Sequence, residues 1–428
     1  MTEQLTAAEA AHRLGVKPAT LYAYVSRGVL TRRKDPADRT SRYDAQEIED
    51  LARRGRPRRP AHAADIVVES ALTEIDGAQF RYRGLDVSGL ATSRSLEEVA
   101  EFLWTGEFPG HPEPWRARPG ALAVGRAAQA ALPAGALPLE RLQVIVPAMA
   151  ATDPLRLQLD PPAVRAAARG LITGLVDCLP EPGGAASPGA AASGAGSSGA
   201  GSPGGEPDPA APIAERLWSR LTSRRPAPGL LAALSAALVL LADHELAAST
   251  LAARVAASVR ADPYAVVATG LGAVSGALHG GASLGAENLL TAAATPAGVP
   301  AVIRDLLRRG ERVPGFGHFV YRGGDPRAAQ LLALIAAAAP RSRMLAVADA
   351  VRAEVGGRGL PGPNIDFALA VLSRVAGMID GASEAIFAVA RTAGWSAHAM
   401  EEYVRATPLR PRAVYVGPAP RDAGAQGS

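Results

Sequence analysis

Alanine and leucine dominate the hydrophobic pattern of the chain. Apolar residues recur at helical spacing in five runs, residues 227–241, 247–259, 328–339, 342–355 and 367–375, which predicts helices there. Strand signals are few, and we expect strands only over residues 65–72 and 79–82. The pattern therefore predicts a mainly α body.

Two segments interrupt this pattern. Residues 180–211 are almost entirely Gly, Ala, Ser and Pro, a composition that buries too little apolar surface to offset the entropy lost on ordering. We expect a flexible surface insertion there. Residues 56–64 are rich in Arg and Pro, and we expect them to form a basic linker between an N-terminal module, residues 1–55, and the body.

The N-terminal module has the pattern of a helix-turn-helix. Thr6 and Glu9 have the spacing of a capping box at the start of a first helix, and Pro18 suits the first turn of a second helix. On the second helix, Leu21 and Val25 would face inward. Four other side chains would then be available to a DNA groove, namely Lys17, Thr20, Tyr24 and Arg27.

This module resembles the small winged helix-turn-helix domains of the MerR and excisionase type. Residues 32–43 would form a basic wing and residues 45–54 a third helix, with the second helix in the major groove. The first 60 residues carry 13 Lys and Arg against 8 Asp and Glu, a net +5, whereas the rest carries 32 against 33, a net −1. Such a basic module suggests a DNA partner. A trihelical docking or oligomerisation domain remains the alternative.

The cysteine count and the apolar runs limit the class of protein. The single cysteine, Cys178, excludes a disulfide framework and a cysteine-rich metal site, and it fits a reducing compartment. The apolar runs are too short to span a bilayer, and no charged-then-apolar leader opens the chain. We expect a cytoplasmic protein without a membrane partner.

Two of the seven histidines lie in glycine-rich segments, residues 276–282 and 313–327. Glycines let a ligand approach the backbone and leave N–H groups uncovered. Because imidazole titrates near neutral pH, His279 and His318 could share proton transfer with Asp366. Either histidine alone could be a core residue beside a loop glycine, but the three together indicate an active site. Nearby arginines indicate an anionic substrate bound through its carboxylates.

These segments resemble the citrate synthases. The family's two catalytic-histidine motifs are similar to residues 278–282 and 314–322, its Asp-His-Glu segment to residues 242–250, and its N-terminal signature to residues 75–86 and 97–109. The matches keep their order along the chain from about Asp65 to Gly417.

The resemblance implies a citrate synthase fold that follows the helix-turn-helix module. Its large helical domain would comprise residues 65–278 and 386–428, and its smaller mobile helical domain residues 279–385. It also implies an obligatory homodimer with shared active sites.

The implied activity is that of a citrate synthase of the tricarboxylic acid cycle, an acyltransferase. Asp366 would remove a proton from the acetyl-CoA methyl group while His279 hydrogen-bonds the thioester carbonyl. His318 would hydrogen-bond the oxaloacetate ketone and protonate the new alkoxide. Hydrolysis of the citryl thioester would then release citrate and CoA, with no metal or other cofactor.

The resemblance also implies two sets of binding residues. The substrate ligands would be His244, Arg327, Phe387, Arg391 and Arg410. Arg410 would come from the neighbouring subunit, although Arg391 and Arg410 could also be ordinary surface arginines. The CoA ligands would be Val313, Pro314, Gly315, Phe316, Gly317 and Arg322.

Three departures from the family pattern leave the substrate open. Ser283-Leu284 stands where many relatives have Asn-Glu, Phe319 where bacterial relatives often have Arg, and Ala-Leu-Ala at 368–370 where they have Tyr-Ser-Gly. A 2-methylcitrate synthase uses propionyl-CoA on the same residues, and one methylene changes binding by only ~1–3 kcal/mol. A DNA-binding regulator that senses metabolites on this scaffold is the third hypothesis, although a sensor needs no general base.

Overall fold

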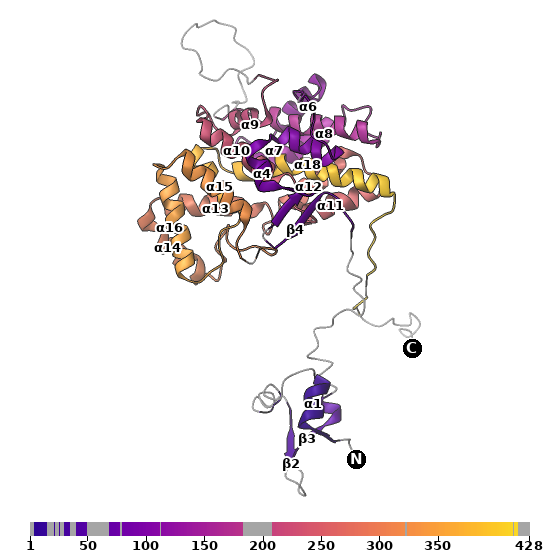
Figure 1. Ribbon diagram of the computed structural model, residues 1–428, viewed down its shortest axis with the longest axis vertical. Coiled ribbons are helices and arrows are strands. Elements are labelled where there is room, and N and C mark those ends of the chain that lie inside the picture. Colours follow the sequence, from indigo (N-terminus) through magenta and orange to yellow (C-terminus); the bar gives the residue numbers. More distant parts are fainter. Residues whose placement is uncertain are drawn as a thin grey trace, which may run out of the picture. The chain divides into compact units, whose positions relative to one another are not determined.

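The structure is a computed structural model (Figure 1). It describes residues 4–14, 21, 25, 30–34, 40–48, 68–77, 79–111, 113–182, 208–321, 323–413 and 415–417. The chain divides into two compact units, Ser70–Arg410 and a smaller unit of Met1–Glu69 with Pro411–Ser428. Most of the predicted insertion, 180–211, lies outside the described residues.

Within its described residues, the smaller unit contains helix α1 beside a three-stranded antiparallel sheet, and residues 45–48 are also helical. Its elements are β1 (Gln4–Thr6), α1 (Ala7–Leu14), β2 (Arg32–Lys34) and β3 (Ser41–Asp44), and the strand order is β1-β3-β2. The predicted capping box is confirmed, because the Thr6 N–H donates to Glu9 at 2.8 Å and the Glu9 N–H donates to Thr6 Oγ1 at 3.3 Å.

The core of this unit includes a residue of the predicted second helix. Leu21 is fully buried with Tyr43 and Ile48, and Val25 packs against them. The inward direction predicted for Leu21 and Val25 is thus confirmed. The four residues predicted to contact DNA, Lys17, Thr20, Tyr24 and Arg27, lie outside the described part of the chain.

The larger unit begins with a second antiparallel sheet. Its strands are β4 (Thr73–Asp76), β5 (Gln79–Tyr82) and β6 (Leu85–Asp86), in that order. The prediction of a strand over 79–82 is confirmed. The strand predicted over 65–72 is wrong for the described residues 68–72, because the Ala71 N–H donates to Glu401 at 2.9 Å instead of to a strand partner. Pairing begins only at Thr73, opposite Tyr82.

The other described elements of this unit are helical, which confirms the mainly α prediction. They are α4 (Val87–Ser93), α5 (Leu96–Thr105), α6 (Pro119–Ala130), α7 (Pro138–Ala150), α8 (Pro161–Asp177), α9 (Ile213–Leu221), α10 (Pro228–Leu241), α11 (Ala248–Ser258), α12 (Pro263–Val274), α13 (Gly281–Ala293), η1 (Pro296–Gly298), α14 (Val299–Arg308), α15 (Pro326–Ala338), α16 (Arg343–Gly357), α17 (Ile365–Ala376) and α18 (Ala382–Arg405). The five predicted helical runs match α10, α11, α15, α16 and α17 to within two residues at each end.

Helix α18 forms the centre of this unit, and the residues from Ala382 to Met400 are buried. It packs against α8, α10, α11 and α12 (Figure 1) and also against α5. Helix α10 is apolar on all sides, as a helix enclosed by neighbours must be. Helices α13 to α16 lie together on one side of the unit (Figure 1), and the predicted boundaries of the large and small domains stay predictions. No described helix combines the length and the apolar character needed to cross a membrane.

Candidate active site

His279 lies in the tight connection between α12 and α13. A Cβ atom on the next residue, Gly280, would overlap Val274, so only glycine lets the chain fold back onto the end of α12. The His279 Nε2 atom lies 2.8 Å from the hydroxyl of Ser249 on α11. Burial, aided by the charge of Arg391, lowers the pKa of His279 to about 4. The ring is therefore neutral near pH 7.

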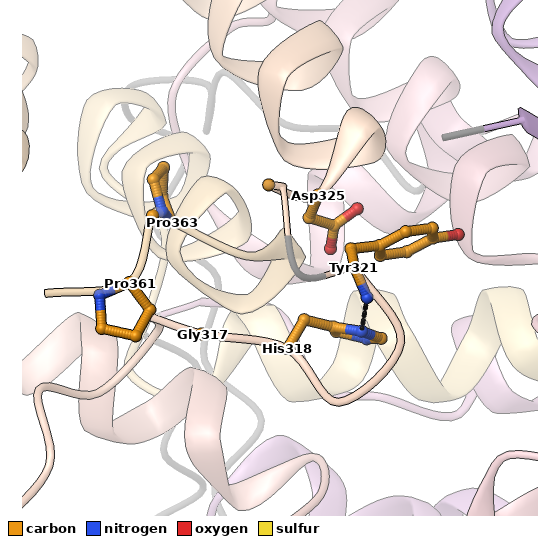
Figure 2. Close-up of a pocket in the computed structure, with 8 residues that line it drawn as sticks. Gly317, His318, Tyr321, Asp325, Pro361 and Pro363 are labelled. Atoms are coloured by element: carbon orange, nitrogen blue, oxygen red, sulfur yellow. Dashed lines mark hydrogen bonds between the residues drawn. The ribbon is translucent and has the colours of Figure 1, made fainter. Parts of the chain in front are cut away.

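His318 holds its own loop in place. Its Nδ1 atom accepts the N–H group of Val320 at 3.1 Å and that of Tyr321 at 3.3 Å (Figure 2). Because backbone N–H groups only donate, Nδ1 carries no proton and the neutral ring is protonated on Nε2. Burial and the charge of Arg327 lower the pKa of His318.

The protonated nitrogen of His318 faces a second donor. The Nε2 atom lies 3.3 Å from Nη2 of Arg327, and the arginine donates to Nε2 when that nitrogen carries no proton. With the proton on Nε2, both groups present N–H donors side by side. Arg327 is buried in a salt bridge with Asp325, at 2.8 Å. Such a pair of donors suits an oxygen that is negative or is becoming negative.

Asp325 links this loop to helix α17. Its carboxylate accepts Arg327 Nε and the Ile365 N–H, both at 3.0 Å. The charge of Arg327 outweighs burial and holds the pKa of Asp325 below its usual range. The loop that carries His318 and the helix that carries Asp366 therefore share one buried anion.

Asp366 lies in the first turn of α17. The side chain of Asn364 caps the helix and accepts the Asp366 N–H at 3.0 Å, while Ser283 Oγ donates to Asp366 Oδ1 at 2.6 Å. Burial raises the pKa of Asp366 to about 6 against the opposing effects of Ser283 and Arg327. This carboxylate is ionised at neutral pH and is more basic than an ordinary aspartate, as a general base should be.

The other predicted substrate ligands border the same place. The His244 ring lies 5.5 Å from that of His318 and its Nε2 atom lies 3.0 Å from the Tyr321 hydroxyl, and burial lowers the pKa of His244 well below its usual value. The His279 ring meets the edge of the Phe387 ring at 5.5 Å.

Arg391 is a buried cation with an unused donor. Its guanidinium lies 4.6 Å from the Phe387 ring centre, and its Nε donates to Leu241 O at 2.7 Å. Its Nη1 atom has no hydrogen-bond partner among the described residues. Burial lowers the pKa of Arg391 to about 10, so the group stays charged. A buried guanidinium with a free N–H suits an anionic ligand.

A pocket of about 240 Å³ opens beside His318. Its lining includes Tyr321 and Asp325, together with the segment Pro361–Pro363 (Figure 2). The predicted CoA loop, 313–317, borders it and is tied down, because Gly317 N–H donates to Gly362 O at 2.8 Å and Asn364 Nδ2 donates to Gly317 O at 2.9 Å. Of the remaining predicted ligands, Arg322 lies outside the described residues and Arg410 is exposed at the end of the larger unit.

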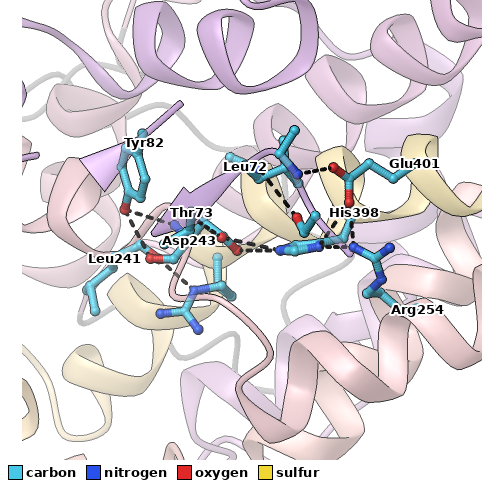
Figure 3. A network of polar contacts seen from close by, with 12 residues as sticks. Leu72, Thr73, Tyr82, Leu241, Asp243, Arg254, His398 and Glu401 are labelled. Carbon is cyan, nitrogen blue, oxygen red and sulfur yellow. Dashed lines mark hydrogen bonds and ion pairs between the residues drawn. The ribbon is translucent and has the colours of Figure 1, made fainter. Parts of the chain in front are cut away.

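A buried polar network supports the segment that carries His244 (Figure 3). Asp243 accepts a hydrogen bond from Thr73 Oγ1 and lies 3.2 Å from His398 Nε2. Arg254 donates to the other ring nitrogen of His398 and pairs with Glu401, each at 2.5 Å. Because Arg254 can only donate, Nδ1 accepts its hydrogen bond and Nε2 donates to Asp243.

Three contacting residues were not named as site residues from the sequence, namely Ser249, Tyr321 and Asn364, and Ser283 was noted only as a departure from the family pattern. Ser249 and Tyr321 lie inside the segments 242–250 and 314–322, and motif position was the only signal available for them. Ser249 and Ser283 act on partners 30 and 83 residues away.

Comparison with known proteins identifies the family of this chain. Residues 63–412 match the family described as "Citrate synthase, C-terminal domain". A citrate synthase of Haloferax volcanii is 33% identical over 387 residues, which cover 82% of this chain and 94% of the relative. The chain belongs to the citrate synthase family.

Other relatives differ in how much of this chain they cover and in the activity that they are named for. "Citrate synthase 2" of Bacillus subtilis is 38% identical over 213 residues, which span 48% of this chain and only 56% of that relative. A 2-methylcitrate synthase of Mycobacterium tuberculosis is 29% identical, covering 78% of this chain and 84% of the relative. The solved citrate synthase of Thermoplasma acidophilum, in a ternary complex with carboxymethyl coenzyme A and oxaloacetate, matches with a TM-score of 0.66 and 25% identity, over 84% of this chain and 96% of that chain.

Proposed function

We propose that this protein is a cytoplasmic citrate synthase, an acyltransferase that condenses acetyl-CoA with oxaloacetate and hydrolyses the citryl thioester. One observation carries the proposal. A carboxylate with a raised pKa, Asp366, shares its site with two neutral histidines and two buried arginines. This is the set of groups that carbanion chemistry next to a thioester requires.

The first step is the removal of a methyl proton from acetyl-CoA by Asp366. The electrons of the C–H bond pass into the enolate, and charge develops on the thioester oxygen. Neutral His279 can stabilise that oxygen only through a ring N–H. If Ser249 donates its hydroxyl proton to Nε2, the ring proton lies on Nδ1 and is available to the thioester.

The second step is attack of the enolate carbon on the ketone of oxaloacetate. The neighbouring donors of His318 and Arg327, 3.3 Å apart, would bind the ketone oxygen. His318 would give its Nε2 proton to the alkoxide and regain one from solvent, while Asp366 releases the proton that it took from the methyl group. Arg391 and His244 would bind the carboxylates. Water then cleaves the C–S bond and CoA leaves as the thiol, so neither step uses a metal or another cofactor.

Release of free CoA thiol from acetyl-CoA plus oxaloacetate tests the proposal. The wild-type protein should turn over, and Asp366→Asn should lose nearly all activity because an amide cannot take the proton. The control is Asp380→Asn, since Asp380 is an exposed carboxylate that pairs with Arg374. Turnover that survives in Asp366→Asn would overturn the assignment of the base.

We propose acetyl-CoA as the acyl donor for this site. The alternative is 2-methylcitrate synthase activity, which uses propionyl-CoA. Phe319, which is almost fully exposed, and Ser283, which touches Asp366, both depart from the family pattern. Values of kcat/KM for acetyl-CoA and propionyl-CoA decide between the two. A preference for propionyl-CoA would replace the first assignment with the second.

We also propose that the protein acts as a homodimer. Leu251, Val255 and Val259, at four-residue spacing along α11 and its C-cap, are exposed, and a second copy would cover this stripe. Arg410 is exposed and would complete the partner's site.

Two experiments test the dimer. Val255→Asp should give a monomer in light scattering and little activity, whereas Val124→Asp, at an exposed valine on α6, should not. Mixing Asp366→Asn with Arg410→Gln chains should restore part of the activity, because one site of each mixed dimer is intact. A mixture as inactive as its components would argue against a shared site.

For the smaller unit we propose DNA binding through a winged helix-turn-helix. It is supported by the pairing of Arg32–Lys34 with Ser41–Asp44 where a basic wing is predicted, and by the buried Leu21. Gel-shift titration on the chain's own promoter should show sequence preference, a steep loss of affinity with salt and a response to oxaloacetate. Binding no tighter than to random DNA would favour a docking domain.

A further inference from the structure

Ser283 is a buried hydroxyl directed at the proposed base. Its side chain is 0% exposed, and its Oγ donates to Asp366 Oδ1 at 2.6 Å. A hydroxyl that donates to an ionised carboxylate forms one of the stronger hydrogen bonds in proteins. This contact holds one oxygen of Asp366 in place.

Ser283 belongs to the segment that carries the proposed electrophile. It lies in the first turn of α13, and its N–H donates to Gly280 O at 2.9 Å. Helix α13 packs along α17, the helix of Asp366. A rigid turn therefore connects His279 to Ser283, and one hydrogen bond connects Ser283 to Asp366.

The two oxygens of Asp366 have different environments. Oδ1 accepts from Ser283, whereas within the described part of the chain Oδ2 accepts no hydrogen bond. The base can use only one oxygen, and the free one needs no bond broken before it accepts a proton. Oδ2 is therefore the oxygen that receives the proton from the acyl-CoA carbon.

We propose that Ser283 is a positioning residue for the catalytic base: its hydroxyl fixes Oδ1 of Asp366, directs Oδ2 to the acyl-CoA carbon opposite His279, and favours the ionised carboxylate. The inference rests on the proposed condensation. In that step the proton passes from carbon to Oδ2 and the C–H electron pair becomes the enolate bond. Ser283 itself gives up no proton and touches no substrate.

Other charged groups also act on Asp366. Asp325 and Arg327 lie at the start of α15, and Arg391 and Glu384 lie on α18. A substitution at Ser283 leaves all four in place. A change in the titration of Asp366 can then be assigned to the lost hydrogen bond, which lowers the pKa of an acceptor carboxyl.

The test compares Ser283→Ala, Ser283→Thr and Ser373→Ala with the wild type. Ser283→Ala removes the donor, and Ser283→Thr keeps it. Ser373 is a matched control, because it is a fully buried serine on α17 whose hydroxyl has no hydrogen-bond partner among the described residues. The measurements are CoA release as a function of pH and thermal unfolding of each variant.

We expect Ser283→Ala to move the acidic limb of the kcat/KM profile upward by about one pH unit and to lower kcat at pH 7 roughly tenfold, with little change in KM for oxaloacetate. Ser283→Thr should restore the wild-type limb, and Ser373→Ala should not move it. An Ala profile that superimposes on the wild type, with both proteins folded, overturns the inference.

A second readout separates this inference from the proposed function. Difference infrared titration follows the protonated carboxyl of Asp366, which is identified by the loss of its band in Asp366→Asn. Its midpoint should rise in Ser283→Ala whether or not the protein turns over acetyl-CoA. An unshifted midpoint sinks the role of Ser283, whereas a wild type without CoA release contradicts only the condensation.

Discussion

Gly394 of α18 lies directly against the carboxylate of Asp243. A Cβ atom at Gly394 would fall well inside van der Waals contact of both Asp243 Oδ1 and Ala242 O, and the Gly394 N–H donates to Ala242 O at 2.9 Å. Helix α18 therefore packs against Ala242 and Asp243, just before His244, so closely that a side chain at Gly394 has no room. The position of His244, a proposed substrate ligand, therefore depends on a residue without a side chain.

Gly394→Ala should therefore destabilise the protein and weaken oxaloacetate binding. The added methyl has no room, and overpacking of this kind costs about 1–3 kcal/mol. Because the displaced backbone carries Asp243 and His244, KM for oxaloacetate should rise with the loss of stability. The control is Gly170→Ala on α8, where a Cβ would meet nothing within 4 Å, and there stability should stay equal or increase slightly. Equal unfolding curves for the two variants would contradict the close approach.

Tyr321→Phe should weaken oxaloacetate binding without unfolding the protein. The phenol lies 3.0 Å from His244 Nε2, and the ring that remains keeps its packing against His244 and His318. Loss of one hydrogen bond should raise KM for oxaloacetate about threefold to tenfold. Tyr403→Phe is the matched control, because its hydroxyl donates to Ala261 O at 2.6 Å and contacts no proposed ligand. Steady-state kinetics decide, and an unchanged KM would remove Tyr321 from the site.

Asp325→Asn should cost far more stability than a similar change at the surface. Asp325 and Arg327 form a buried pair, and loss of one charge leaves the other uncompensated, at about 3 kcal/mol. Asp380→Asn removes the partner of Arg374, but Asp380 is 73% exposed, so its effect should stay below about 1 kcal/mol. Denaturant unfolding measures both. Similar losses would mean that the Asp325–Arg327 pair is not buried in solution.

The helices and the order of the motifs could be predicted from sequence, because both are local properties. Alanine- and leucine-rich periodicity located α10 and α17 to within two residues, and glycines beside His279 and His318 identified the loops. The strand expected over 65–72 failed because an apolar run does not reveal that the Ala71 N–H bonds Glu401, 330 residues away. Hydrogen-bond partners so distant in sequence leave no local signal.

The chemistry of the site shows the same limit. Sequence reasoning predicted Asp366 as the base, but gave no signal that Ser283 donates to it or that Ser249 faces His279. The sequence supplied the residue types of the proposed site. The neutral state of His279 and His318 follows from their burial in the folded chain. The convergence of His318 and Arg327 could be read only from the folded chain.

The last prediction concerns Glu384, a buried carboxylate outside the proposed mechanism. Glu384 is 5% exposed, and within the described residues its side chain accepts no hydrogen bond. Burial, together with the charges of Glu287, Glu140 and Asp366, raises the pKa of Glu384 from 4.5 to about 7. Below its unfolded pKa, such a carboxyl is protonated in both states and does not weaken the folded protein. As the pH rises from the unfolded pKa to the folded pKa, the unfolded chain ionises first and the folded protein loses stability.

Glu384→Gln should remove this pH dependence, since the amide stays neutral. The variant should match the wild type near pH 4.5, gain stability over it between pH 4.5 and 7, and keep a constant advantage above that, of at most about 3 kcal/mol. Exposed Glu107→Gln is the control and should show no such window. Free energies of unfolding at several pH values measure the effect. A Glu384→Gln curve parallel to the wild type across the whole range would mean that Glu384 is ionised in the folded protein at no cost.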